Sequence, residues 1–232
     1  MSGNENRIII RAVSKRNGVT TTLIGSGLLA LAFLVITLLP SILFLSGVFI
    51  ASAGIVGLVI GWFKIREPKY SLEITPEGIR YIHRHGEWRL RWENVQRIDT
   101  PRVTRGIEVK DLEMIGFRIK MMEPIVNTIS PRLATNILIE QRPLLLQNPD
   151  EKCVTGNCVG ADLLEGDQFK LPNGRVLNGV QAMFANRMST LRERLGYDLF
   201  IAAAELDRPV NEFVTLLRDC QQSVLINAQK SR

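Results

Sequence analysis

Residues 23–63 read LIGSGLLALAFLVITLLPSILFLSGVFIASAGIVGLVIGWF, and they include no charged side chain. A helix needs about 20 apolar residues to cross a hydrocarbon core of about 30 Å, and this stretch is twice that long. Pro40 ends the first helix and Ser41 can cap the second, because proline cannot continue a helix whereas serine accepts from free amides at a helix start. The sequence therefore predicts a transmembrane hairpin over residues 20–63.

A cleaved signal peptide is the competing interpretation of this stretch. The tail ahead of it is basic, and Ala51-Ser52-Ala53 resembles a cleavage site. However, the apolar run before that site is about twice the ~7–15 residues of a signal peptide, and it continues beyond the site. The length favours two spanning helices.

Both flanks of the predicted hairpin are basic. Residues 1–19 form a tail with four cations against a single acid, and residues 64–69 add three cations against one more acid. Since basic flanks remain on the cytoplasmic side, we expect an integral membrane protein with both termini in the cytoplasm.

Small residues follow one another at four-residue spacing in the second helix, at Ala53, Gly57 and Gly61. Such a stripe allows another helix to approach closely. The favoured partner is the first helix of the same hairpin, and a homodimer through the same residues is the alternative.

The remaining chain, residues 66–232, is expected to form one soluble α+β domain. Alternating apolar residues predict an antiparallel sheet within residues 70–121. A helical and loop insertion follows over residues 123–196, and a closing strand and helix occupy residues 197–227.

One hairpin of this sheet has a register that can be predicted. With His85-Gly86 as a two-residue loop, Arg84 faces Glu87, Tyr81 faces Leu90, and Arg80 faces Arg91. The alternation then places Trp88 and Trp92 on one apolar face, so both are expected in the core.

A family resemblance is carried by two short motifs after the membrane hairpin, Thr75-Pro-Glu-Gly-Ile79 and Trp92-Glu-Asn-Val95. Over residues 20–120 the chain resembles bacterial membrane-anchored pleckstrin-homology-like proteins, many of which have no assigned function. The resemblance implies a pleckstrin-homology-like antiparallel sheet with packed helices and a closing helix. It also implies an integral protein of the bacterial inner membrane. The segment from about Glu123 to Gly196 departs from that pattern.

The sequence offers little for catalysis, and we predict no catalytic residue, no cofactor and no metal. The two histidines, His83 and His85, lie at a predicted β-turn, and the common nucleophile and phosphate-binding motifs are missing. A zinc site would need both histidines together with Cys153 and Cys158, about seventy residues away. The cysteines, which include Cys220, are expected to be free thiols in a reducing cytoplasm. The acidic residues Asp162, Glu165 and Asp167 lack the signature of a cation-binding loop.

Four arginines on the predicted outer face of the sheet are the candidate binding residues: Arg80, Arg84, Arg89 and Arg91. Guanidinium groups in a cluster can hold phosphates or an acidic partner. The alternative is a solvated face neutralised by acids such as Glu73 and Glu93.

These observations favour a noncatalytic, membrane-tethered interaction or regulatory module that binds a protein partner or anionic lipid headgroups. The pI near 9.5 could also indicate nucleic acid, but the membrane tether argues against such a partner. The alternative is a membrane-lipid-modifying enzyme or accessory factor with its site in residues 147–176, a long segment without clear structure.

Overall fold

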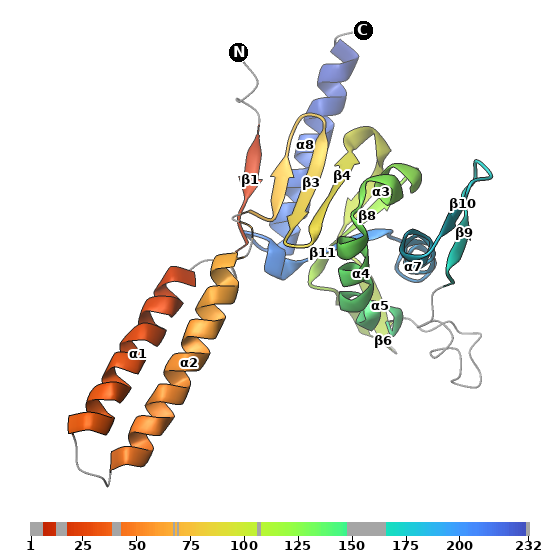
Figure 1. Cartoon of the computed structure of the whole chain (residues 1–232). Helices are drawn as coiled ribbons and strands as arrows, with labels where there is room; N and C mark the ends of the chain where they lie inside the picture. The colour runs from red at the N-terminus through yellow and green to blue at the C-terminus, as the bar shows by residue number, and fades with distance from the viewer. Residues whose placement is uncertain are drawn as a thin grey trace. The chain divides into compact units, whose positions relative to one another are not determined.

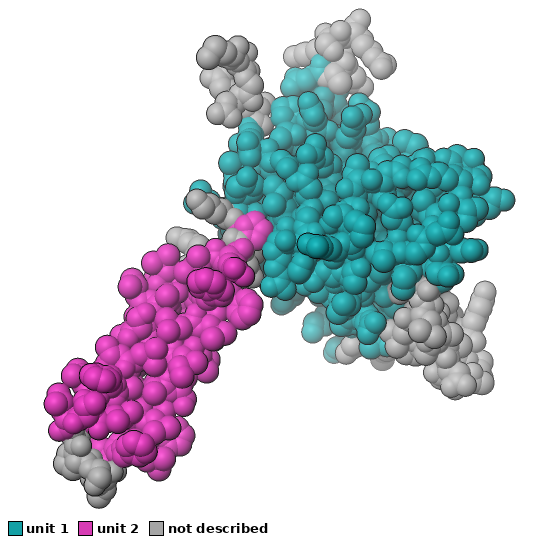
Figure 2. Space-filling model, viewed as in Figure 1, with its two compact units in different colours: residues 1–11, 70–232 teal, residues 12–69 magenta. Residues whose placement is uncertain are grey.

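The computed structural model in Figure 1 describes residues 7–12, 18–38, 43–66, 68, 70–105, 108–147 and 166–230. The chain divides into two compact units, shown in Figure 2. One is Ala12–Lys69, and the other combines Met1–Arg11 with Tyr70–Arg232.

The first unit is a pair of antiparallel helices, α1 (Gly18–Leu38) and α2 (Phe44–Arg66). Both are long and apolar enough to cross a membrane. The two helices expected within residues 20–63 are therefore confirmed. The predicted turn at Pro40-Ser41 lies outside the described residues.

Small residues at seven-residue spacing form the seam between these helices. The buried positions are Gly18, Gly25 and Ala32 on α1 and Gly47, Gly54 and Gly61 on α2. A Cβ atom on Gly25 would lie 2.7 Å from the backbone nitrogen of Leu58, so the two backbones touch. Such close approach is what small residues allow in membrane helices.

The predicted stripe of Ala53, Gly57 and Gly61 therefore needs correction. Gly57 and Gly61 contact α1 as expected, but Ala53 is exposed and the neighbouring Gly54 occupies the seam. The buried repeat is seven residues because antiparallel helices wound around each other meet along a 3.5-residue period.

The second unit contains two antiparallel sheets and two separate hairpins. The described strands are β1 (Ile8–Ile10), β2 (Leu72–Ile74), β3 (Gly78–His83), β4 (Gly86–Arg91), β5 (Val95–Asp99), β6 (Arg102–Arg105), β7 (Glu108–Asp111), β8 (Met114–Ile119), β9 (Gln168–Lys170), β10 (Val176–Asn178) and β11 (Leu199–Ala202). One sheet has the order β1-β2-β3-β4 and the other β11-β8-β5, whereas β6-β7 and β9-β10 pair alone.

Five helices of this unit, in the described part of the chain, pack against its strands or against one another. They are α3 (Glu123–Thr128), α4 (Pro131–Glu140), α5 (Arg142–Leu145), α7 (Val180–Leu195) and α8 (Val210–Lys230), with short 3-10 turns η3 (Trp92–Asn94) and η4 (Ala203–Glu205). The Ser130 hydroxyl caps α4 by accepting from the Leu133 amide at 3.2 Å, and Gly196 ends α7 in the left-handed conformation. The closing helix α8 donates from Arg218 to the Ile98 carbonyl of β5 at 3.0 Å.

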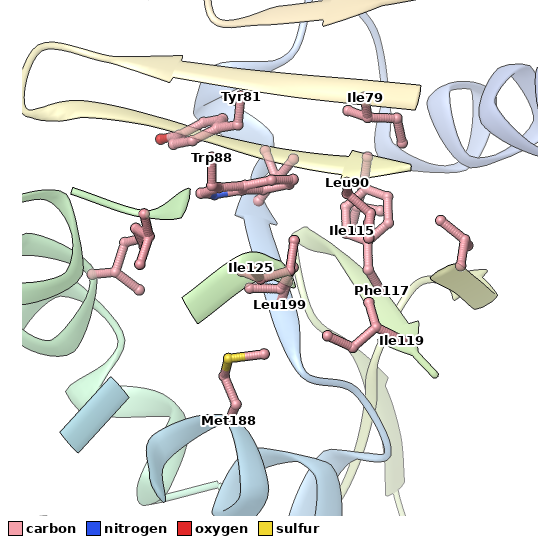
Figure 3. Close-up of a cluster of buried hydrophobic side chains, with 14 of the residues drawn as sticks. Ile79, Tyr81, Trp88, Leu90, Ile115, Phe117, Ile119, Ile125, Met188 and Leu199 are labelled. Atoms are coloured by element: carbon pink, nitrogen blue, oxygen red, sulfur yellow. The ribbon is translucent and has the colours of Figure 1, made fainter. Parts of the chain in front are cut away.

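The hydrophobic core lies between the two sheets, as Figure 3 shows. Trp88 on β4 meets Phe117 on β8 edge to face, with ring centroids 6.3 Å apart. Trp88 and Trp92 are 1% and 2% exposed. The prediction that both tryptophans belong to the core is confirmed.

Strand β1 was not predicted, because residues 1–19 were expected to form only a basic tail. Ile8 pairs with Ile74 and Ile10 pairs with Leu72, so β1 adds an edge strand to the first sheet. The Ser71 amide donates to the Ile10 carbonyl at 3.0 Å, and Ile10 is buried. The chain therefore leaves the sheet at β1, runs through both apolar helices, and returns to the neighbouring strand.

The predicted register of the β3–β4 hairpin is wrong by two residues. Arg80 pairs with Arg89 and Tyr81 with Trp88, which leaves Arg84-His85 as the loop. Gly86 (φ +140°) lies so close to Ser130 that a Cβ atom would overlap the serine hydroxyl. That close approach to the start of α4 leaves no room for a side chain at this position. A shift of two residues keeps every side chain on its predicted face.

Candidate anion-binding face of the β3–β4 hairpin

The outer face of the β3–β4 hairpin contains three of the four candidate arginines, and the loop contains the fourth. Arg80 lies on β3, Arg89 and Arg91 on β4, and Arg84 in the loop between them. Because side chains alternate along a strand, the first three point away from the apolar face that holds Trp88.

A carboxylate between them explains how the like-charged pair Arg80–Arg89 is tolerated. Glu87 accepts from the Arg80 Nε at 2.8 Å and from the Arg89 Nη2 at 2.8 Å. Burial alone would raise the pKa of Glu87, but the hydrogen bonds from both arginines outweigh it and lower the pKa below its ordinary value. Glu87 is therefore ionised at neutral pH and bridges the two cations. The predicted partner of Glu87 was Arg84, and that pairing is wrong.

Glu73 on β2 is a second carboxylate beneath the same face, and it is only 7% exposed. It accepts from the Arg7 Nε at 2.7 Å and lies 3.4 Å from the Arg80 Nη1. Arg80 is thus held by two acids and has a structural role. Arg7, which precedes the two apolar helices in sequence, joins the network across β1 and β2. The sequence analysis did not identify Arg7. The signal that could have found it is the apolar run Ile8–Ile10 beside it, which forms the strand that brings Arg7 to Glu73.

The other arginines are less restrained. Arg91 is exposed and forms no ion pair among the residues that the structure describes. It lines a surface hollow of about 270 Å³ together with Arg80, Arg89 and the acids Glu73 and Glu77. Arg84 donates from Nε to His85 Nε2 at 3.0 Å and is also exposed.

The predicted neutralising acids are half right. Glu73 belongs to the network, but Glu93 forms no ion pair within the described part of the chain. The face keeps more cations than acids, and Arg84, Arg89 and Arg91 present guanidinium groups to solvent. Such groups form paired hydrogen bonds with phosphate oxygens.

Two other predicted features concern metals and thiols. In the described ranges, no three histidine, cysteine, aspartate or glutamate residues come together as metal ligands. His83 stacks on Tyr81 with centroids 6.1 Å apart. Cys153, Cys158, Asp162 and Glu165 lie outside the described residues, and Asp167 is exposed.

Cys220 on α8 is a free thiol in the structure. Burial raises its pKa, with a smaller contribution from Asp219. The thiol is therefore protonated at neutral pH, which disfavours a nucleophilic role.

Comparison with known proteins assigns the chain to a family. The family model DUF2982, described as a protein of unknown function, matches residues 72–223. Neither the curated proteins nor the solved structures include a match to the chain. The matched region begins with β2 and ends within α8, so it includes the whole arginine-bearing hairpin and more than half of the chain. The chain belongs to the DUF2982 family of proteins of unknown function.

Proposed function

We propose that this protein is a noncatalytic binding module, tethered to the bacterial inner membrane with both termini in the cytoplasm, whose β3–β4 face holds the phosphate groups of anionic lipids. The observation that carries the proposal is the excess of exposed guanidinium groups on that face. Arg91 in particular is exposed beside a hollow and forms no ion pair among the described residues.

The pairing of β1 with β2 supports the proposed topology. These strands directly precede and follow the two apolar helices, and they form one sheet. If both helices span a bilayer, the two flanks must lie on the same side. The basic residues of both flanks favour the cytoplasmic side.

The energetics of a tethered domain support lipids as the ligand. Each cation near an anionic membrane contributes about 1 kcal/mol, and the attraction decays within a Debye length of about 8 Å. Because β3 begins at Gly78, soon after α2 ends at Arg66, the tether keeps the local concentration of headgroups high. Weak individual contacts are then sufficient.

The arrangement of the sheets supports the pleckstrin-homology-like fold that we propose for this unit. Two antiparallel sheets share one core, and a C-terminal helix, α8, packs on β5 and β8. An experimental structure would test that assignment.

The binding test uses a variant in which a short Gly-Ser turn replaces residues 12–69, so that β1 and β2 become an ordinary hairpin. This variant is expected to float with vesicles that contain phosphatidylglycerol at low salt and to be released at high salt. Replacing Arg84, Arg89 and Arg91 by Gln should abolish flotation. Arg80 is kept because it holds Glu73 and Glu87 inside the fold.

A matched triple variant supplies the control. Replacing the exposed residues Arg132, Arg142 and Arg208 by Gln removes the same charge elsewhere and should leave flotation unchanged. Equal loss in both triple variants would reduce the effect to net charge. If the parent variant is folded by circular dichroism but ignores anionic vesicles, the lipid proposal is wrong, and an acidic protein partner becomes the ligand to seek. The enzyme alternative, placed in residues 147–176, remains a prediction because residues 148–165 lie outside the described ranges.

A further inference from the structure

A second hollow, of about 370 Å³, lies on a different part of the domain, between the end of β8, the start of α3 and the β9–β10 hairpin. Figure 1 shows this hairpin standing beside α7. The volume falls within the range of about 300–1,000 Å³ that is usual for small-molecule sites. Its apolar lining comes from Met121, Met122, Phe169 and Leu171. Methionine side chains adapt readily to the shape of an apolar ligand.

One wall of this hollow is held in place by the protein itself. The Asn94 side chain accepts from the Met121 amide and donates to the Met121 carbonyl, both at 2.8 Å. Two residues earlier in the chain, the Ile119 amide donates to the buried Asp198 at 2.9 Å. The segment between Ile119 and Met122 is therefore fixed before any ligand arrives, which lowers the entropic cost of binding.

Arg192 contributes an oriented cation to the same hollow. Its Nε donates to Asp198 at 2.6 Å, and its Nη2 donates to the Ile119 carbonyl at 2.8 Å. The remaining nitrogen, Nη1, makes no hydrogen bond to any residue that the structure describes. The guanidinium is thus fixed in position and keeps donor capacity for a ligand.

Two lysines complete the positive charge at the rim. Lys120 and Lys170 line the hollow, are exposed, and form no ion pair within the described ranges. Glu123, the one acid among the described residues that line the hollow, is already engaged. Both of its oxygens accept from the Asn173 amide at 3.0 Å. Glu123 also lies 3.8 Å from Arg175. An apolar floor with uncompensated cations at its edge therefore matches a ligand that is apolar at one end and anionic at the other.

We propose that this hollow binds one small amphipathic anion, an apolar chain that ends in a carboxylate or a phosphate. The chain lies against Met121, Met122 and Phe169, and the anionic end meets Lys120, Lys170 and Arg192. This site is separate in residues from the arginines of the β3–β4 hairpin and does not depend on their function.

The test uses the full chain in phosphatidylcholine nanodiscs and a photoreactive diazirine analogue of decanoic acid, with the labelled peptides mapped by mass spectrometry. We expect labelling of the peptides that contain residues 120–123 and 168–173. The double variant Lys120→Gln/Lys170→Gln should reduce it about tenfold, the loss expected from two partly exposed charge contacts. Lys110→Gln, which removes an exposed lysine of β7, should label as the parent does.

Further arms identify the headgroup and separate this site from the lipid-binding face. Decanoate or decyl phosphate should compete with the probe, and the stronger competitor identifies the anion. The corresponding photoreactive alcohol should not label these peptides, and Arg84→Gln/Arg89→Gln/Arg91→Gln should leave labelling unchanged. Equal labelling by the alcohol, no competition by either anion, or full labelling of the double lysine variant would overturn the proposal.

Discussion

Trp92 combines a buried ring with a specific hydrogen bond, because it is 2% exposed and its Nε1 donates to the Thr75 carbonyl at 2.9 Å. We predict that Trp92→Ala lowers the free energy of unfolding by about 3–5 kcal/mol, the usual cost of removing a large buried aromatic ring. Trp92→Phe keeps most of the ring and loses the donor, so about 1–2 kcal/mol is expected. Urea denaturation of the variant with residues 12–69 replaced provides the measurement. If both substitutions lowered the free energy of unfolding equally, the ring of Trp92 would contribute nothing beyond its hydrogen bond, and the prediction would be wrong.

The strands that precede Trp92 show what the alternation of apolar and polar residues can predict. Apolar and polar residues alternate through β3 and β4, which correctly predicted the face on which each side chain lies. The pairing partners were not predicted. The loop that sets them contacts the start of α4, where the Ser130 hydroxyl donates to the His85 carbonyl at 2.8 Å and lies against Gly86. Gly86 and Ser130 are 44 positions apart in the sequence, and nothing local to the hairpin indicates that α4 begins there.

The ion pairs of the candidate site were also predictable only in part. Alternation in the sequence correctly placed Arg80, Arg89 and Arg91 on one face and pointed to Glu73 as an acid beside them, whereas Arg84 lies in the loop. Alternation could not predict that Glu87 bridges Arg80 and Arg89, because that bridge depends on the two-residue shift in register. Arg7 was missed for a different reason: its contact with Glu73 exists only because β1 joins the sheet.

Helices α1 and α2 offer a matched pair of glycines for a test of their seam. A Cβ atom on Gly25 would lie 2.7 Å from the Leu58 backbone nitrogen, whereas one on Gly27 meets nothing within 4 Å. We predict that Gly25→Leu forces the helices apart and that Gly27→Leu does not. The distance between spin labels on the exposed faces of both helices, measured in nanodiscs, should increase only in the first variant. An unchanged distance in Gly25→Leu would show that the seam lies elsewhere.

The lengths of these helices could be predicted from the uncharged stretch of sequence. The residues of the seam between them could have been predicted as well. Glycine and alanine recur at seven-residue spacing in both helices, a repeat hidden by the more familiar four-residue stripe in α2. Strand β1 was harder to predict. Three isoleucines between basic residues are too short a run to separate strand from tail by periodicity. Ile8–Ile10 form a strand by pairing with the edge of β2, and that edge is more than sixty residues away in the sequence.

The topology of the whole chain is the broadest prediction. Since β1 and β2 form one sheet and both flanks are basic, alkaline phosphatase fused after Arg66 or after Arg232 should be inactive in bacterial cells. The same enzyme inserted between α1 and α2 should be active, because that turn would lie across the membrane. Activity at both outer points would overturn the assignment and would place Cys153 and Cys158 in an oxidising compartment.

The pairing of β1 with β2 also has a consequence for the order of events during synthesis. Strand β1 emerges from the ribosome before the other strands of this sheet, yet 61 positions separate its last residue, Ile10, from Ser71. At about 5–20 residues per second, β1 must wait roughly 3–12 s for its partner strand. Both apolar helices are made during that interval. The first sheet is therefore completed only after both apolar helices have been synthesised, so a finished first sheet marks a chain whose two helices are already complete.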